Sequence, residues 1–276
     1  EFWARFYCTA NIIEMVREFE GNNEWALILG SSSGLGLATA KKLAQHGLNL
    51  CLIYRSRKSD TAGILELFQA IASKHQVEVL EFNVDIVKTE NREMVLDKLV
   101  GKATVKVLVH SIAKGNLKPM TAHDSRELQN DDFHLTLENM AISLYDWTKA
   151  VFAKHLFAKD ARVISFTSEG NKKAWKNYAA VSAAKVALEA ITRNIALEFA
   201  PHGIRANCIE AGVTDTASLR MIPGNEQLIE HTLKRNPFKR LTTPEDVANA
   251  VYLLSKDEAR WITGAIIPVN GGEHLN

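Results

Sequence analysis

The sequence has few cysteines and little net charge, and each shortage excludes a class of protein. The three cysteines, Cys8, Cys51 and Cys208, are an odd number, lie far apart and lack the spacing of metal ligands. We therefore expect reduced thiols, no metal site and a cytoplasmic protein rather than a disulfide-rich secreted one. The net charge at pH 7 is +1, from 33 basic and 32 acidic side chains. A balance so close to neutral gives no indication of nucleic-acid binding.

Long apolar runs are also missing. No run approaches the roughly 20 residues that span a bilayer, although 46% of the residues are hydrophobic. We find no internal repeat or linker, so residues 24–276 are expected to form one sizeable domain with a buried core. Residues 1–23 precede the first apolar run as an N-terminal extension. In it, Phe6, Ile13 and Val16 have a spacing compatible with an amphipathic helix on the domain or on a partner subunit.

Short apolar runs alternate with longer helical patterns along the chain. Buried parallel strands have this continuous apolar character, and their alternation with helices is typical of right-handed βαβ units. We therefore predict an α/β fold, a doubly wound Rossmann-type parallel sheet of about seven strands with helices on both faces. The expected strands are residues 25–29, 48–54, 77–82, 105–110, 161–166, 204–209 and 265–269. The expected helices are residues 35–46, 61–74, 89–100, 131–157, 176–199 and 244–255.

A glycine-rich loop joins the first expected strand to the first expected helix. Its residues are Gly30, Ser31, Ser32, Ser33, Gly34, Leu35 and Gly36. Glycines permit a tight turn and close approach of the backbone to a pyrophosphate, and the helix N-terminus supplies N–H donors. The spacing is GxxxGxG rather than the general GxGxxG. In this position between a strand and a helix, the loop predicts dinucleotide binding.

The tip of the second expected strand is basic. Tyr54 is followed by Arg55, Ser56 and Arg57. An acidic residue here would accept hydrogen bonds from the adenine ribose and favour NAD. Arginines with a serine suit a 2′-phosphate instead, so we predict NADPH rather than NADH. The alternative is a solvated basic turn.

Tyr178 and Lys185 stand seven positions apart near the start of the expected helix 176–199. Seven residues make about two helical turns, so the two side chains would share a face and both reach one extended ligand. A nearby cation or cofactor dipole can lower the pKa of a tyrosine below about 10, which makes it a useful acid. The alternative is an ordinary tyrosine at a helix start and a solvated lysine.

With these motifs, the chain resembles the short-chain dehydrogenase/reductase family over about residues 24–273. Residues 30–36 resemble its phosphate loop, and residues 110–113 take the place of its Asn-Asn-Ala-Gly. Ala211 replaces a family proline, which predicts a less rigid loop. Besides the glycine loop, Arg55 and Ser56, the resemblance implies cofactor contacts from Asn83, Val84, Ser111, Ile112, Ala113, Lys185, Ala211, Gly212, Val213 and Thr216.

The tyrosine lies at an unusual spacing for that family. Ordinary members carry Tyr-x3-Lys with a serine thirteen residues before the tyrosine, but the residue thirteen positions after Ser168 is Val181. Tyr178 gives Tyr-x6-Lys instead. This spacing, with residues 109–113 and 141–145, is similar to the enoyl-acyl-carrier-protein reductase branch, and the C-terminal half looks closest to its NADPH-using members. The resemblance implies NADPH-dependent reduction of the C2–C3 double bond of trans-2-enoyl thioesters in fatty-acid synthesis.

The reaction offers a reason for the longer spacing. A ketone takes hydride at the carbonyl carbon, whereas an enoyl thioester takes it at C3 and develops charge on an oxygen two carbons away. The resemblance assigns Tyr178 to that oxygen and Lys185 to the nicotinamide ribose. Ser168 would support the substrate oxygen or the nicotinamide, or merely cap the strand end. Asn139 is either an active-site asparagine or a buried polar residue, and His110 is expected to be a satisfied strand-end histidine.

The segment 213–240 is expected to form the substrate loop. Its apolar side chains Leu219, Met221, Ile222 and Leu228 suit the wall of an acyl channel, and such a loop over a strand tip is a candidate lid. The segment also holds a basic cluster, Lys234, Arg235, Lys239 and Arg240. This cluster is either a docking patch for an acidic acyl carrier protein or a solvated helix end.

Two other functions stay open at this point. One is a 3-oxoacyl-thioester or other carbonyl reductase of the same fold, against which Val181 argues. The other is a non-catalytic dinucleotide-binding sensor, against which Tyr178 and Lys185 argue. The family resemblance also implies a homo-oligomer, a tetramer or a dimer.

Overall fold

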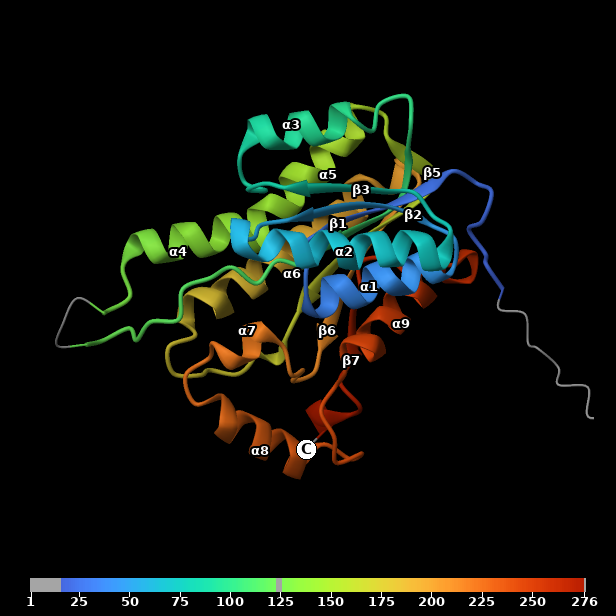
Figure 1. The fold of residues 1–276 in the computed structure, drawn as a ribbon. Helices are drawn as coiled ribbons and strands as arrows, with labels where there is room; N and C mark the ends of the chain where they lie inside the picture. The colour runs from blue at the N-terminus through green and yellow to red at the C-terminus, as the bar shows by residue number, and fades with distance from the viewer. Residues whose placement is uncertain (1–15, 123–125, 276) are drawn as a thin grey trace, which may run out of the picture.

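The computed structural model describes residues 16–122 and 126–275 and has the expected α/β architecture (Figure 1). Across those residues, seven strands form one parallel sheet in the order β3-β2-β1-β4-β5-β6-β7. The strands are β1 (Glu24–Leu29), β2 (Asn49–Tyr54), β3 (Val79–Asn83), β4 (Thr104–His110), β5 (Phe157–Thr167), β6 (Ile204–Ala211) and β7 (Ile266–Val269). The strands are added toward one side of the sheet from β1 to β3 and toward the other side from β4 to β7, so the strand order reverses between β1 and β4. A doubly wound sheet binds its ligand in the crevice at this point, outside the carboxyl ends of the strands.

Helices cover both faces of the sheet, as predicted. Figure 1 shows α3 and α5 above the sheet and α1, α2 and α9 below it. One layer consists of α1 (Gly34–Gln45), α2 (Lys58–His75) and α9 (Pro244–Ser255), and the other of α3 (Thr89–Asp97), α5 (Ser143–Ala153) and α6 (Ala179–Glu198). Successive side chains of β1 point to opposite layers: Trp25 and Leu27 to one, Ala26 and Ile28 to the other. Burial on both sides explains the continuous apolar runs.

Two predicted helices need correction. The expected helix 131–157 is interrupted: α4 (Asn130–Leu137) passes into a π-helical turn, Glu138–Ile142, and then into α5. Such turns occur often at functional sites, and Asn139 lies in this one. The expected helix 176–199 begins only at Ala179, so Tyr178 is its N-cap rather than part of its first turn.

The described part of the N-terminal extension is built into the domain. Residues 16–23 form turns rather than a helix, while Phe6 and Ile13 lie outside the described residues. Phe19 is buried beside the ring of Tyr252, whose hydroxyl donates a 2.6 Å hydrogen bond to Glu18. Glu18 and Phe19 of the extension therefore pack on the domain.

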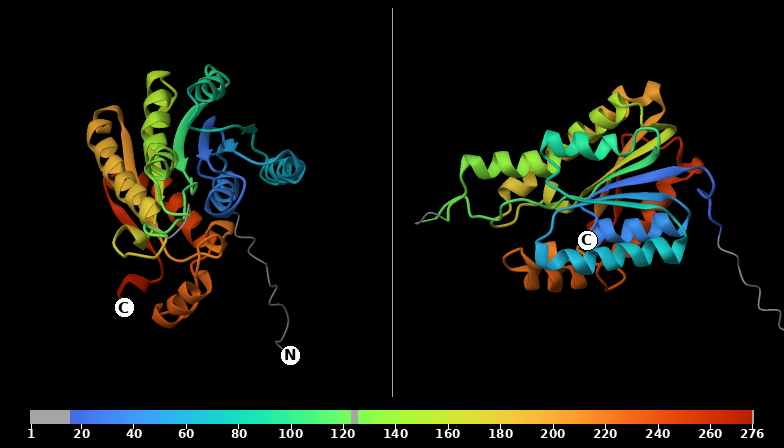
Figure 2. Two further views of the ribbon diagram at one scale, coloured as in Figure 1. Left: turned by 90° about the vertical axis from the view of Figure 1, so that its left-hand side faces the viewer. Right: turned by 45° about the horizontal axis from the view of Figure 1, so that its top comes forward.

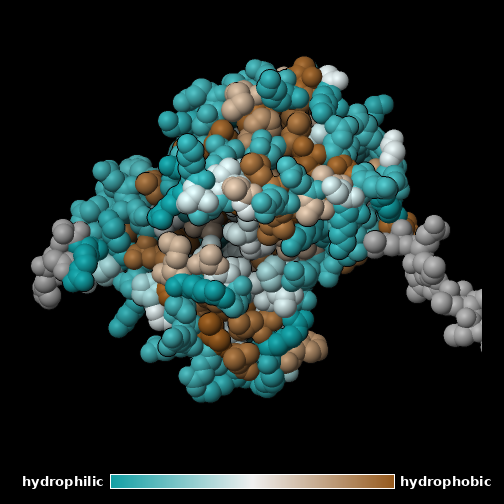
Figure 3. Space-filling model, viewed as in Figure 1, coloured by the Kyte–Doolittle hydropathy of each residue, from teal (hydrophilic) through white to brown (hydrophobic). Residues whose placement is uncertain are grey.

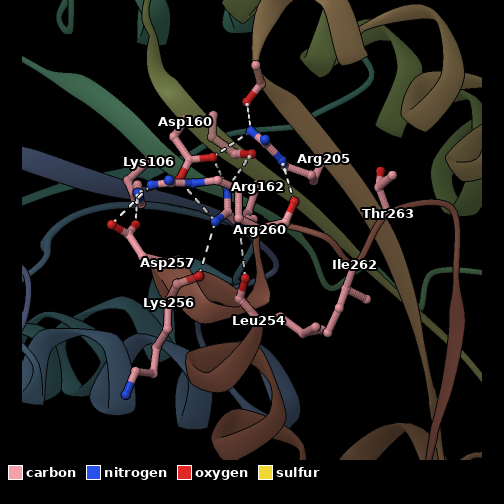
Figure 4. A network of polar contacts seen from close by, with 12 residues as sticks. Lys106, Asp160, Arg162, Arg205, Leu254, Lys256, Asp257, Arg260, Ile262 and Thr263 are labelled. Carbon is pink, nitrogen blue, oxygen red and sulfur yellow. Dashed lines mark hydrogen bonds and ion pairs between the residues drawn. The ribbon is translucent and has the colours of Figure 1, made fainter.

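A buried polar network connects elements at the end of the sheet opposite the carboxyl ends of the strands (Figure 4). Arg162, at the start of the inner part of β5, donates to the carbonyl of Leu254 at 2.9 Å and to that of Lys256 at 3.1 Å. Its guanidinium also meets Asp160, which pairs with Arg205 at 2.6 Å as well. Burial opposes the charge of Asp160, but the Arg162 hydrogen bonds and nearby cations outweigh it and lower the pKa to about 2. The network joins β5, β6 and the end of α9 to one another, and it lies far from the carboxyl ends of the strands.

A less anchored segment connects β6 to α9. It contains α7 (Ala217–Arg220) and α8 (Asn225–Arg235), which both views of Figure 2 show in orange, displaced from the sheet. Thr232 is the one residue of α8 that is fully buried. Hydrophobic burial therefore contributes little to holding α8 in place.

Two kinds of feature do not occur in residues 16–122 and 126–275. None of their helices is long and apolar enough to cross a membrane. Their histidines, cysteines and carboxylates form no cluster of three or more that would hold a metal ion.

Candidate active site

A cavity of about 990 Å³ opens at the carboxyl ends of the strands. Figure 3 shows the hollow between the body of the domain and the α7–α8 segment, with apolar residues gathered on the α8 side. All the residues predicted for the site line this cavity except Ser31, Gly36 and Asn83. The structure thus brings together loops that are far apart in the sequence.

The three exceptions contact or pack against the segments that line the cavity. The Ser31 hydroxyl is buried and donates to the carbonyl of Ile53 at 3.1 Å. A Cβ at Gly36 would come within 2.1 Å of the Gly30 carbonyl oxygen, so the helix and loop can pack this closely only with glycine. The Asn83 side chain accepts a 2.9 Å hydrogen bond from the Ser56 amide and fixes the basic strand tip.

The glycine loop packs too closely against the neighbouring backbone to admit a side chain at Gly30. Gly30 has a φ of +85°, and a Cβ there would lie 2.1 Å from the Ser111 carbonyl oxygen. The following helix α1 has no acidic residue in its first turn. Free N–H groups and the positive dipole end therefore face the cavity without a competing carboxylate, which fits a pyrophosphate.

The basic strand tip has an acidic neighbour that the sequence analysis missed. Arg55 contacts Asp85 with an Nη1–Oδ2 distance of 2.5 Å, and the Arg55 side chain is 60% exposed. Asp85, Arg57 and Arg55 all line the cavity. The signal was present, because Asp85 follows the tip of β3, the strand paired with β2.

Tyr178 stands at the cavity beside a glycine that makes room for it. A Cβ at Gly170 would lie only 2.6 Å from Cε1 of the Tyr178 ring. Burial raises the pKa of Tyr178, and the nearby Ser168 hydroxyl opposes this rise. Nevertheless, within the described residues the buried Oγ of Ser168 makes no well-formed hydrogen bond. A buried hydroxyl without a protein partner, on a cavity wall, is available to a ligand.

Lys185 is buried, so the alternative of a solvated lysine is wrong. Its Nζ donates a 2.7 Å hydrogen bond to the carbonyl of Phe166. Burial lowers the pKa of Lys185 to about 8, although Cys208 and Glu189 oppose the change. The Lys185 ammonium group therefore titrates only slightly above neutral pH. It lies in the same cavity as Tyr178.

His110 and Asn139 each have a hydrogen-bond partner, although Nδ1 of His110 makes no bond within the described residues. His110 shares a 2.8 Å hydrogen bond with the hydroxyl of Ser143 and is buried. Burial first, and the Lys185 charge second, lower the pKa of His110 to about 3, so it is neutral near pH 7. Asn139 lines the cavity and also donates to the Leu135 carbonyl at 2.8 Å, so both of its suggested roles fit.

An apolar wall completes the cavity. Val181, at the usual tyrosine position, is buried and packs with Met140 and Ala184. Every apolar residue predicted in the substrate loop lines the cavity, namely Leu219, Met221, Ile222 and Leu228. Sequence reasoning missed further lining residues, among them Leu117, Met140, Phe166, Trp175, Asn270 and Glu273. They lie in loops, at a strand end or in π- and 3₁₀-helical turns, where no periodic pattern distinguishes them.

The predicted basic cluster is not an unpaired patch. Lys234 pairs with Glu230 at 2.6 Å on the surface, and Arg240 pairs with Asp246 at 2.6 Å. Arg235 turns inward, with only 8% of its side chain exposed. This arrangement does not favour a dedicated docking patch, and the burial of Arg235 differs from a fully solvated helix end.

Comparisons with known proteins agree with this geometry. A family described as enoyl-(acyl carrier protein) reductase matches residues 30–274. An enoyl-[acyl-carrier-protein] reductase (NADH) of Aquifex aeolicus is 30% identical, with 91% of each chain covered. A 3-oxoacyl-[acyl-carrier-protein] reductase of Staphylococcus epidermidis is 27% identical, covering 92% of this chain and all of that one. A crystal structure of the Aquifex aeolicus protein superposes with a TM-score of 0.81, covering 94% of this chain and 98% of that one at 27% identity.

Proposed function

Because the chain belongs to the short-chain dehydrogenase/reductase family, in its enoyl-(acyl carrier protein) reductase group, we propose that it reduces the C2–C3 double bond of trans-2-enoyl thioesters with NADPH in fatty-acid synthesis. The observation that carries this proposal is that Tyr178 and Lys185 share one cavity in which Val181 occupies the usual tyrosine position. The acyl group would arrive on acyl carrier protein or coenzyme A, and we expect the enzyme to act as a homo-oligomer.

The cavity fits both a dinucleotide and an acyl group. Gly30 and Gly36 let the loop pack closely against the neighbouring backbone, next to the free N–H groups of α1. Arg55 and Ser56 would hold the 2′-phosphate, and Lys185 would bind the nicotinamide ribose hydroxyls. The bound cofactor supplies the hydride that C3 receives. The apolar side chains of the substrate loop would enclose the acyl chain and exclude water.

Tyr178 provides the hydrogen bond to the reacting thioester. Its phenol would donate to the thioester oxygen, on which negative charge develops as C3 is reduced. The raised pKa keeps this phenol protonated near neutral pH. The Lys185 ammonium adds positive potential. Ser168 brings a hydroxyl without a protein partner to the same wall.

A substrate comparison tests this proposal against its alternatives. NADPH oxidation would be measured with crotonyl-CoA or an enoyl carrier thioester, and in parallel with acetoacetyl-CoA. We expect turnover of the enoyl substrates. Turnover of the 3-oxo substrate alone would instead identify a carbonyl reductase, consistent with the 3-oxoacyl reductase relative. NADPH binding without turnover across a broad substrate panel would indicate a sensor.

Replacing Arg55 with alanine is expected to raise the KM for NADPH about tenfold and to leave the KM for NADH within about twofold. A hydrogen bond to a charged group contributes about 1.5–3 kcal/mol, and exposure reduces this contribution. The matched variant is Asp85→Asn, which removes the carboxylate that pairs with Arg55 and should lower the KM for NADPH. Steady-state kinetics with both cofactors checks the pair. An unchanged NADPH-to-NADH ratio in Arg55→Ala would refute 2′-phosphate recognition.

The kcat/KM for NADPH is expected to fall as pH rises above about 8. This constant reports groups of the free enzyme, in which Lys185 has a pKa of about 8. A lysine carries its charge below its pKa and loses it above, so the ammonium contact disappears on the alkaline side. Lys185→Arg, whose side chain stays charged at all these pH values, should shift this limb out of range. If the limb persists unchanged in Lys185→Arg, another group causes it.

A further inference from the structure

Several polar contacts that hold the α8 helix converge on Arg235. The Arg235 side chain is 8% exposed and lies between two carboxylates, those of Glu169 and Glu273. Its Nη2 lies 2.5 Å from Glu273 Oε1. Thr232, one turn earlier in α8, donates a 3.0 Å hydrogen bond to the same Glu273 oxygen. We call Arg235, Glu169 and Glu273 the latch.

Glu169 connects the latch to the turn that follows Ser168. It directly follows Ser168 and begins the 3₁₀ turn Glu169–Asn171 at the end of β5. The next residue, Gly170, is the one whose missing Cβ makes room for the Tyr178 ring. The Gly170 carbonyl also accepts a 2.5 Å hydrogen bond from Ser182 in α6. A displacement of Glu169 would therefore reach the wall against which Tyr178 packs.

The rest of this turn is fixed to the body of the domain. Asn171 donates to the buried carboxylate of Glu189 in α6. Lys172 pairs at 2.6 Å with Glu210, which is buried in β6. The turn is thus held on one side by the body and on the other by Arg235 of α8, so the latch links α8 to the body through this turn.

We propose that Arg235 is a positioning residue that closes the α7–α8 segment over the acyl cavity and keeps the turn Glu169–Asn171 in register with Tyr178. Glu169 and Glu273 themselves line the cavity, so the latch stands beside the route of the acyl group. Glu169 also pairs with Lys173 at 2.8 Å, whereas the Glu273 carboxylate is buried. Removing the guanidinium therefore leaves the buried Glu273 carboxylate without its cation, a costly arrangement that opening of α8 would relieve. Only the kinetic part of the test depends on the proposed enoyl reductase function.

Hydrogen exchange of the full chain, with and without NADPH, tests the latch independently of turnover. In Arg235→Met, we expect amides of residues 217–235 to exchange at least about tenfold faster, with β1 and β4 unchanged. Glu169→Gln keeps the shape of the side chain and should show a smaller increase. Glu230→Gln is the matched control, because it breaks an exposed ion pair of the same helix and should change exchange less than about twofold.

The kinetic part measures crotonyl-CoA reduction by the same variants. Arg235→Met should raise the KM for crotonyl-CoA about tenfold, with a smaller loss in kcat, and Arg235→Lys should recover part of this loss. Unchanged exchange of residues 217–235 in both Arg235→Met and Glu169→Gln would overturn the latch. If Arg235→Met unfolds the whole chain, the Glu169→Gln result decides. Faster lid exchange in a protein without enoyl turnover would support the latch and refute the proposed function.

Discussion

Replacing Tyr178 with phenylalanine is expected to lower kcat for the enoyl thioester about 10²–10³-fold, the usual loss when one donor to a developing oxyanion is removed. The affinity for NADPH should stay within about twofold, because the phenol is assigned to the thioester oxygen. Phenylalanine keeps the ring that packs against Gly170, so the cavity wall should stay in place. Single-turnover kinetics, which separate the chemical step from product release, would measure the effect alongside a binding titration.

Tyr145→Phe is the matched control for that experiment. Tyr145 lies in α5, is 42% exposed and does not line the cavity. Loss of its hydroxyl should leave both kcat and NADPH affinity unchanged. Full activity in Tyr178→Phe would show that the Tyr178 hydroxyl is not required, and the Ser168 hydroxyl would then be the candidate donor to the thioester oxygen.

Replacing Gly30 with alanine should weaken NADPH binding at least about 100-fold and destabilise the fold. Alanine would have to adopt a φ near +85° with its Cβ 2.1 Å from the Ser111 carbonyl oxygen. Backbone strain and overpacking each cost about 1–3 kcal/mol. Relief requires β1 and β4 to separate at the phosphate loop, which distorts the loop. Binding titration and thermal unfolding would measure the two effects.

Gly63→Ala provides the contrast, since a Cβ there would meet no atom within 4 Å. Gly63 lies inside α2, so alanine should stabilise the helix by about 1 kcal/mol and leave NADPH binding unchanged. Wild-type NADPH affinity in Gly30→Ala would show that the close packing of this loop is not required for the cofactor.

The fold was predictable because its signals are local. Each strand of the sheet coincides with an apolar run, with ends shifted by a few residues, since burial on both faces demands such runs. The glycine loop was equally predictable, because a strand followed by a glycine-rich loop and a helix leaves few alternatives. The interruption of the helix at Glu138–Ile142 could not be predicted, since a π-turn changes the backbone hydrogen bonding without breaking the apolar pattern.

The missed parts of the site depend on contacts between distant residues. Arg235 has the sequence context of a solvated cation at a helix end, yet its partners Glu169 and Glu273 lie 66 and 38 residues away. Arg55 likewise meets Asp85 across 30 residues. Burial of a charge follows from tertiary packing, which residue spacing within one segment does not encode.

The buried arginine of β5 constrains when the chain can complete its fold during synthesis. The carbonyl partners of Arg162 lie 92 and 94 residues downstream, at Leu254 and Lys256. β1, β2 and β3 can pair as soon as they leave the ribosome, because they are neighbours in both sequence and sheet. β5, by contrast, carries a guanidinium that lacks these acceptors until the end of α9 has emerged. The nascent protein therefore contains an early half and a late half, and Arg162 is satisfied only when the last helix docks.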